Sequence, residues 1–552
     1  MLIRAGWTGK NRMAALERKA PLWTKTGSLM QIESNLNAIL KSALGSYCRR
    51  FVQLDDLNAH FVLSVNALMK RSGEPFGAER HRRLDGLLGS GIRTEADLRS
   101  WVREFFPGGD ARLCGICRKQ ADRFVKAGIK IFVWKEPFQS VSRPCPAVLF
   151  GKGPIDFNRP LFAVFNSRKP RLISPDSDWL RALRFFFLNL DLRGIALAGS
   201  TGTLTHDLVG AHAVRSGLAR VLALPFPVLQ AEGELFKIYG EAANEMPVLS
   251  CMLDSFCRPR PQALVCRDRI LGRLADIHLI LEVRSRGNLS AALEEIQEES
   301  PRHQLIYEPA EATMASAGNK GLFEKFPKFA HTFGLPKSMG SAVKGRCKPV
   351  KTSILRSDDI AWDDYLFHYT RGCAGPWPGE ACRDYLLGLF DGCPLSGHSA
   401  LDTLIRIMRE KLIRAGSRMV RGSTGVISWS SHPPRELFLM RKWNRALVRW
   451  TVEPYGIAVR RDILRSLGAK PAVYGSDRAY SRLAEAEKYR FQLSRSSSAS
   501  SWRHEREWRV SGDLALGAIR SDGRFVFVRA MEEKEKLLGN VNPDMPVAVL
   551  DA

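Results

Sequence analysis

One stretch decides the fold class of this chain, Val265-Cys-Arg-Asp-Arg-Ile-Leu-Gly-Arg-Leu-Ala-Asp-Ile-His-Leu-Ile-Leu-Glu-Val-Arg-Ser-Arg-Gly-Asn-Leu289. It predicts a helix that opens on the paired arginines Arg267 and Arg269, an apolar strand over 277–283, and a basic, glycine-bearing loop that starts another helix. A buried parallel strand delivers such a loop to one edge of its sheet, where backbone N–H groups and the next helix N-terminus favour negative charge. The stretch therefore predicts an anion site, with phosphate as its natural occupant.

The same alternation of apolar runs and amphipathic helices continues on the N-terminal side of this stretch and just beyond it. Strands are predicted over 161–165, 194–199, 219–225, 246–252 and 303–307, and helices over 177–192 and 206–217. Strands that alternate with helices through short loops are typical of an α/β fold with a doubly wound parallel, Rossmann-like sheet and right-handed crossovers.

Composition shifts divide the chain into four parts. Residues 1–146 carry the period of amphipathic helices and are predicted to be mainly helical, and 147–312 hold the Rossmann-like pattern. Residues 313–356 are rich in Gly, Ser and Lys and are interpreted as a basic linker. Residues 357–552 mix strand-like and helical runs, which predicts an α+β C-terminal domain.

The charge of the chain points to an anionic partner. Its 83 Lys and Arg against 57 Asp and Glu give a formal net charge of +26, which favours a polyanion on its surface. A proteome that uses arginine freely is the alternative explanation. No apolar run of about 18 residues occurs, so no membrane partner is expected and the location is predicted to be cytoplasmic.

The eleven cysteines form no regular framework. Cys114-Gly-Ile-Cys117 is a lone C-x-x-C pair without a second pair at zinc-ribbon spacing, so two buried thiols explain it better than a metal. Cys373, Cys382 and Cys393, with His368 and His398 nearby, are a still weaker signal. No metal site is predicted.

Three loops that follow core strands should meet at the carboxyl edge of the sheet. They span 166–170, 199–203 and 284–288. The first and third carry cations, and the small residues of the second let backbone N–H groups approach a ligand closely. Glycines needed only for tight turns would not require the accompanying arginines. The candidate phosphate-binding or nucleic-acid-binding residues are Ser167, Arg168, Lys169, Gly199, Ser200, Gly202, Arg267, Arg269, Ser285 and Gly287.

The order of these pieces resembles a known family. Ser-Arg-Lys-Pro after a strand, Ala-Gly with a later Ala211-His212, the segment that opens on Arg267, and Ser285-x-Gly287-x-Leu289 look like the Rossmann-like domain of the DNA-processing protein A (Smf) family, over about residues 147–310. The resemblance implies binding of single-stranded DNA along a groove lined by those candidates. It also implies loading of a RecA-type recombinase during DNA uptake. Asn166 replaces a family glycine, and Asp268 puts a carboxylate where the family has an amide.

The C-terminal domain carries a second, looser resemblance. His368 and Tyr369 on one strand-like run, Ser428 on another and Glu507 late in the domain are similar to the His, Ser-or-Tyr and Glu constellation of ADP-ribosyltransferase-like folds in phage-defence proteins. The resemblance implies NAD as a cofactor, with the histidine orienting its ribose and the glutamate activating the acceptor, and Glu505 is the alternative acid. Structural ion pairs of both acids with neighbouring arginines are the competing interpretation.

Three functions remain open from the sequence. The leading one is a single-stranded DNA-binding protein of the DNA-processing A type. The second is a nucleotide- or DNA-sensing phage-defence protein with an ADP-ribosyltransferase-like effector. The third is the nucleotide N-glycosidase activity of lysine-decarboxylase-like phosphoribohydrolases, which ranks last because Leu204, Thr205 and His206 stand where that family has its catalytic Glu. The oligomeric state also remains open, with a homodimer among the alternatives.

Overall fold

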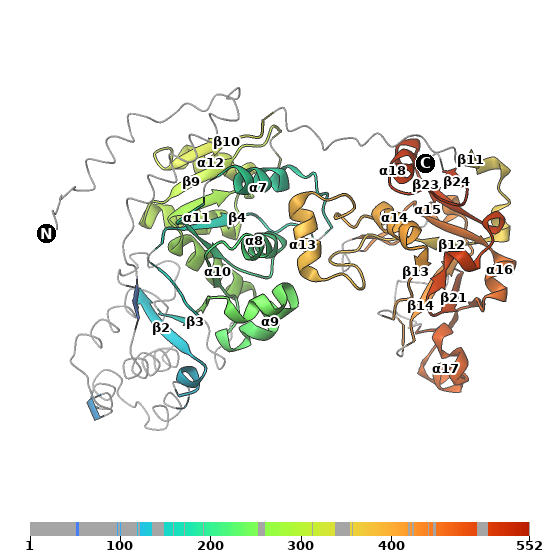
Figure 1. The fold of residues 1–552 in the computed structure, drawn as a ribbon, viewed down its shortest axis with the longest axis horizontal. Coiled ribbons are helices and arrows are strands. Elements are labelled where there is room, and N and C mark those ends of the chain that lie inside the picture. The colour runs from blue at the N-terminus through green and yellow to red at the C-terminus, as the bar shows by residue number, and fades with distance from the viewer. Residues whose placement is uncertain are drawn as a thin grey trace. The chain divides into compact units, whose positions relative to one another are not determined.

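The computed structural model describes residues 51–53, 122–134, 148–336 and 354–550, with isolated residues between 96 and 119 and gaps at 158, 171, 191, 252–259, 312, 337–353, 356, 418–419, 422–423, 440, 445–448 and 494–505. The chain forms two compact units (Figure 1). The first comprises 1–169, 175–340 and 381–392, and the second comprises 170–174, 341–380 and 393–552. Cys114 and Cys117 lie outside the described residues.

The first unit is built on a ten-stranded sheet in the order β1-β2-β3-β7-β6-β5-β4-β8-β9-β10. Neighbours from β7 to β10 run parallel, whereas β1, β2, β3 and β7 pair antiparallel. The strands are β1 (Phe51–Gln53), β2 (Ile129–Trp134), β3 (Val148–Lys152), β4 (Leu161–Phe165), β5 (Ala196–Gly199), β6 (Arg220–Ala223), β7 (Val248–Ser250), β8 (Ile277–Ile280), β9 (His303–Tyr307) and β10 (Ala330–Phe333). The predicted doubly wound, Rossmann-like fold is confirmed by this order.

Helices cover both faces of this sheet. They are α7 (Asp178–Asn189), α8 (Leu204–Arg215), α9 (Ala231–Tyr239), α10 (Arg260–Leu274), α11 (Asn288–Glu299) and α12 (Ala317–Lys325). Successive side chains of a strand point to opposite faces. Accordingly, Phe162 of β4 packs on Phe186 and Phe187 of α7, while Ala163 and Phe165 belong to a core shared with α10, α11 and α12.

The interpretation of residues 313–356 as a basic linker is wrong for the first part of that range. This part forms α12 and β10, the seventh parallel strand of the sheet. Its small residues serve close packing: a Cβ on Gly318 would lie 2.7 Å from the carbonyl oxygen of Val283. Asn319 is buried and bonds the ends of two strands, donating to Leu281 and Tyr307 and accepting from Val283. In addition, β1 and β2 fall within the part predicted to be mainly helical.

Helix α13 (Cys382–Asp391) belongs to the first unit although the residues on both sides of it belong to the second. Its Phe390 stacks on His212 of α8 with ring centroids 4.0 Å apart, and Asp391 accepts two hydrogen bonds from Arg215 of the same helix. The predicted C-terminal domain is therefore interrupted, since α13 buries its apolar face against α8 and α9.

The second unit is an α+β body around an eight-stranded sheet in the order β11-β24-β23-β17-β12-β14-β21-β18. Its strands are β11 (Ile354–Leu355), β12 (Tyr365–Tyr369), β14 (Val426–Ser430), β17 (Gly456–Arg460), β18 (Lys470–Pro471), β21 (Glu507–Ser511), β23 (Arg524–Val528) and β24 (Val547–Val549). Three two-stranded pieces accompany it: β13 (Leu412–Ile413) with β22 (Leu514–Ala515), β15 (Trp443–Asn444) with β16 (Arg449–Trp450), and β19 (Val473–Gly475) with β20 (Phe491–Leu493).

Two apolar clusters cover the two opposite faces of this second sheet. The larger joins Leu366, Ile427 and Trp429 with α14 (Ala400–Glu410), α16 (Arg461–Ser466) and α18 (Met531–Leu538). The smaller holds Phe367 and Tyr369 with Phe525 and Phe527. The short helices α15 (Pro434–Leu439) and α17 (Asp477–Arg482) complete the unit.

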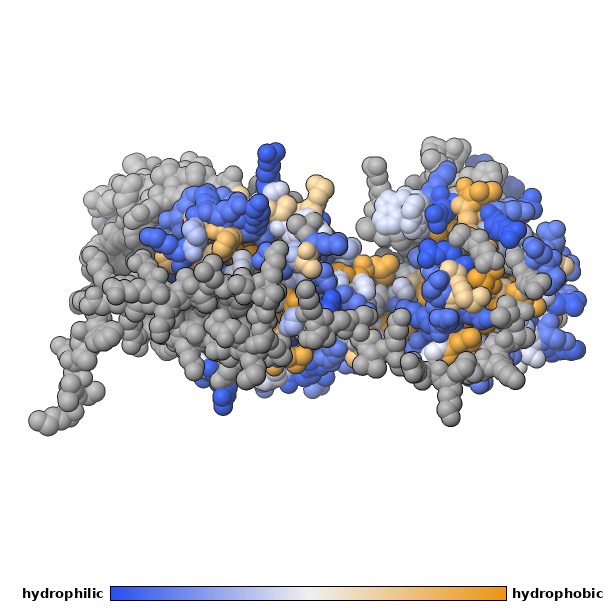
Figure 2. All heavy atoms as spheres, turned by 90° about the horizontal axis from the view of Figure 1, so that it is seen from above, coloured by the Kyte–Doolittle hydropathy of each residue, from blue (hydrophilic) through white to orange (hydrophobic). Residues whose placement is uncertain are grey.

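Hydrophilic residues dominate the described surface in the view of Figure 2, with hydrophobic residues in separate patches. Within the described parts of the chain, no helix combines the length and apolar character needed to cross a membrane.

Candidate nucleic-acid interface

The topological switch point of the first sheet lies between β4 and β8. These strands are parallel neighbours, yet β4 leads to α7 on one face and β8 leads to α11 on the other. Ligands of open α/β sheets bind in the crevice that such divergent loops leave at the carboxyl ends of the strands. Two of the three predicted loops, 166–170 and 284–288, meet at this point.

Ser167 ties these two loops together. Its backbone N–H donates to the Glu282 carbonyl over 2.8 Å, and its hydroxyl accepts the Arg284 N–H over 3.0 Å. Lys169 forms an ion pair with Glu282, and both side chains are largely buried. Burial lowers the pKa of Lys169, with a smaller contribution from the nearby Arg284 charge, against the opposing effect of Glu282. Ser167 and Lys169 therefore shape the edge of the site, and the charge of Lys169 is already neutralised.

Three arginines face solvent at the same point. Arg168 follows β4, and Arg284 and Arg286 follow β8, with Ser285 exposed between them. Among the described residues, no carboxylate pairs with any of the three. Arg286 has a φ of 56°, an uncommon conformation for a residue other than glycine. We call Arg168, Arg284 and Arg286 the arginine rim.

Gly287 ends the second of these loops at the start of α11. It occupies the N-cap of the helix, where its N–H donates to the Ser290 hydroxyl and its carbonyl accepts from that hydroxyl. The positive end of the helix dipole therefore lies next to Arg286, which adds to the attraction for an anion.

The third loop, 199–203, follows β5 and closes on itself. Gly202 has a φ of +89°, which favours glycine, and its N–H donates to the Asp207 carboxylate over 3.1 Å. The Thr201 hydroxyl donates to the same oxygen over 2.7 Å, and the buried Ser200 hydroxyl donates to the Ala223 carbonyl. Because Asp207 occupies donors that a phosphate would use, this loop offers less to an anion than its composition predicts.

Arg267 and Arg269 are both buried. Arg267 donates to the Ser200 hydroxyl over 3.0 Å and to the Thr201 carbonyl over 3.1 Å, so it stabilises the 199–203 loop. It also pairs with Asp268, whose pKa is raised by burial against the pull of that arginine. Arg269 pairs with Glu295 of α11 over 2.9 Å, and thus joins α10 to α11.

Sequence reasoning left Arg284 and Arg286 out of the candidate residues although it identified their loop. The sequence could have indicated both arginines, because they flank Ser285 directly after a buried strand. The pairing of Lys169 with Glu282, 113 residues away, had no local signal. The strongest electropositive feature of the described site is therefore the arginine rim, and Arg168 is the member that sequence reasoning selected.

In the second unit, the sheet brings two of the four nominated catalytic residues into contact. The Ser428 hydroxyl donates to Glu507 over 2.7 Å, and Arg509 and Tyr474 donate to the same carboxylate. Tyr369 shares this face, since it packs with Phe527 while Ile427 and Trp429 belong to the opposite core.

His368 points to the other face of that sheet, where its ring meets Trp429 at 5.5 Å. Its Nδ1 bonds to the Ser428 carbonyl over 3.0 Å, and burial lowers the pKa of His368 to about 4. The alternative acid, Glu505, lies outside the described residues.

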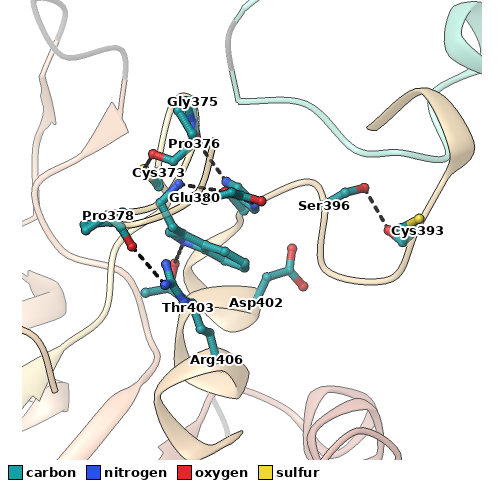
Figure 3. Close-up of polar contacts among 12 residues, drawn as sticks. Cys373, Gly375, Pro376, Pro378, Glu380, Cys393, Ser396, Asp402, Thr403 and Arg406 are labelled. Carbon is teal, nitrogen blue, oxygen red and sulfur yellow. Dashed lines mark hydrogen bonds and ion pairs between the residues drawn. The ribbon is translucent and has the colours of Figure 1, made fainter. Parts of the chain in front are cut away.

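Cys373 and Cys393, two members of the weak cysteine and histidine signal, belong to the second unit, and Figure 3 shows them with polar contacts of the neighbouring residues. His398 bonds to the Gly375 carbonyl over 2.7 Å, faces Glu380 and stacks on Trp377, while the Cys373 thiol donates to the Pro376 carbonyl. Across the described part of the chain, no group of three or more His, Cys, Asp or Glu could hold a metal ion. These contacts stabilise the conformation of the loop around His398.

No family model and no curated protein matches this chain. Solved structures that resemble it include two of DNA processing protein A. One, from Helicobacter pylori and described for its single-stranded DNA binding mode, is 19% identical over 36% of this chain and 83% of its own, with a TM-score of 0.27. Another, from Streptococcus pneumoniae, is 15% identical over 51% of this chain and 95% of its own, with a TM-score of 0.31.

Proposed function

We propose that this chain binds single-stranded DNA at the switch point of its first unit, and that it acts in DNA uptake or recombinase loading. The observation that carries the proposal is the arginine rim, three exposed guanidinium groups without a described acidic partner at the carboxyl ends of β4 and β8. Arginines at such a site neutralise backbone phosphates and gain from counterion release.

The shape of the rim favours a single strand over a duplex. Proteins that read a duplex place a helix or a two-stranded ribbon in its groove. Here the cations stand on two short loops held together by Ser167, at the edge of a buried sheet. A flexible phosphate chain can follow that edge, and the net charge of +26 supports attraction over a longer range.

The experiment compares three probes on the full chain at one salt concentration: a single-stranded DNA, the corresponding duplex and a single-stranded RNA. We expect the single-stranded DNA to bind most tightly, and the variant R168A/R284A/R286A to lose most of that affinity. The matched control is R159A, because Arg159 is an exposed arginine that pairs with Asp156 away from the rim. R159A should bind like the unaltered protein. Equal affinity of the triple variant and R159A for single-stranded DNA would refute the site.

A second candidate function is NAD-dependent group transfer by the second unit. The contact of Ser428 with Glu507, on the face that also holds Tyr369, favours it. The pairing of Glu507 with Arg509 supports the competing structural role. Covalent transfer of ADP-ribose from NAD by the full chain, lost in Glu507→Gln at unchanged melting temperature, would support transfer. A lower melting temperature without any transfer by the unaltered protein would leave Glu507 as a structural ion pair.

A further inference from the structure

A small β-hairpin of the second unit presents two tryptophans to solvent. Trp443 of β15 pairs directly with Trp450 of β16, and their rings meet edge to face with centroids 5.5 Å apart. Trp443 is 48% exposed and Trp450 is 40% exposed. Edge-to-face pairing stabilises the hairpin, yet it leaves ring surface open that a core tryptophan would bury.

The base of the hairpin is fixed to the body of the unit. Leu437 and Val452, on its two sides, are buried, and Lys442 exchanges two hydrogen bonds with Thr451 across the strands, of 2.9 and 3.0 Å. The tryptophans are therefore held in place before any ligand arrives. A rigid aromatic side chain loses little conformational entropy on binding.

The charge of the hairpin is of one sign. The described cations beside the two tryptophans are Arg441 and Lys442, and the sequence between residues 437 and 452 has no Asp or Glu. The Arg441 guanidinium lies over the Trp450 ring at 4.8 Å, and both Arg441 and Lys442 are exposed. Among the described residues, neither of these two pairs with a carboxylate. A ligand that fits this surface has flat apolar faces and negative charges at short intervals.

We propose that this tryptophan hairpin, defined by Trp443 and Trp450 with Arg441 and Lys442 beside them, is a stacking platform for the unpaired bases of a single-stranded nucleic acid. Aromatic rings stack on any base, and neighbouring arginine and lysine side chains bind the phosphates between them. The inference rests on the second unit alone and does not require the arginine rim to bind DNA. If both sites bind one strand, the second contact becomes intramolecular and raises the overall affinity.

The experiment measures binding of the full chain to two labelled 20-mers of equal charge, oligo-dT and an abasic sugar-phosphate chain. The unaltered protein should prefer oligo-dT. The variant W443A/W450A should bind oligo-dT about 5- to 100-fold more weakly, the loss expected when one or two stacked bases lose their platform, and should bind the abasic chain as before. W443F/W450F keeps aromatic rings and should retain most of the preference.

Controls separate this site from the arginine rim and from loss of folding. Phe236→Ala removes an aromatic ring that is 53% exposed in the first unit, and should leave both affinities unchanged. R168A/R284A/R286A should weaken binding of both 20-mers and keep the preference for bases. An unchanged preference for oligo-dT in W443A/W450A would overturn the proposal. It would also be overturned if that variant lost binding to phosphatidylserine vesicles but kept binding to oligo-dT, because the hairpin would then be a membrane contact.

Discussion

At the scale of single residues, burial separates the cations of the first unit into two kinds. Lys169, Arg267 and Arg269 are largely buried and each pairs with a carboxylate. Arg168, Arg284 and Arg286 are exposed at the switch point. Removing one partner of a buried pair leaves an uncompensated charge, whereas removing an exposed cation chiefly changes the attraction for a ligand.

Arg269→Ala should therefore destabilise the protein without weakening DNA binding. Loss of the pair with Glu295 is expected to lower the free energy of unfolding by about 3–5 kcal/mol, a cost typical of a broken buried pair. Chemical denaturation measures the change. Arg159→Ala, which breaks an exposed pair, should cost no more than about 1 kcal/mol. Weaker binding of single-stranded DNA by a fully stable Arg269→Ala protein would place that arginine in the interface.

The sequence predicted the type of residue at this site better than its exposure. Arg267 and Arg269 were chosen because they precede a strand whose loop suits an anion, but Arg267 instead donates to Ser200 and Thr201 of the 199–203 loop. Their burial depends on partners brought close only by folding, since Glu295 lies 26 residues beyond Arg269. Periodicity does not reveal such pairs, because it describes one element at a time.

At the scale of elements, the parallel strands β4 to β9 were predicted from the sequence, whereas β1, β2, β3 and β10 were not. The predicted strands 161–165 and 303–307 coincide with β4, which is apolar throughout, and with β9, which ends on Leu305, Ile306 and Tyr307. Such apolar runs are typical of parallel strands buried on both faces. Strand β10 carries His331 and Thr332 within only four residues, so its sequence lacks that signal. Its place in the sheet depends on α12, which Gly318 and Asn319 hold against the strand ends.

Asn319→Ala tests whether α12 and β10 are integral to the first unit. Its side chain accepts one hydrogen bond of 2.9 Å and donates two of 2.6 and 2.7 Å to buried backbone groups. Leaving these groups unpaired should lower the free energy of unfolding by about 2–4 kcal/mol, measured with urea. Lys320→Ala is the matched control, because that neighbouring side chain is 81% exposed. Equal stability of the two variants would contradict the integral role of α12 and β10 and would support the interpretation of this part as a linker.

The packing of α13 on α8 predicts a pH dependence of stability. His212 lies against Phe390, and burial, together with the Arg215 charge, lowers the pKa of His212 to about 4. In the unfolded chain a histidine takes up its proton near pH 6.5. Between these values the unfolded state binds more protons, so the contribution of His212 to stability is complete above about pH 6.5 and is lost as the pH falls towards 4.

His212→Gln should weaken that dependence. Between pH 7 and pH 4 the unaltered protein should lose up to about 3 kcal/mol more stability than the variant, the value for a pKa difference of about 2.5. Urea titrations across that range measure it. His331 and His368 also have pKa values lowered by burial, but they are present in both proteins and cancel in the difference. Parallel pH curves for the two proteins would contradict the buried, neutral state of His212.

At the scale of the whole molecule, composition predicted an anionic partner but gave it no location. The net charge of +26 is a sum over the chain, and many of its arginines are held in ion pairs. The described structure leaves unpaired cations at the arginine rim of the first unit and at the tryptophan hairpin of the second. A chain with two such contacts should bind long single strands more tightly than strands that reach only one of them.

The salt dependence of single-stranded DNA binding tests the central claim most directly. The logarithm of the binding constant falls linearly with the logarithm of salt concentration, with a slope of about 0.7 for each phosphate neutralised on a single strand. For R168A/R284A/R286A we predict a lower affinity and a slope shallower by about 2 than that of the unaltered full chain. An unchanged slope would contradict the arginine rim as the DNA contact.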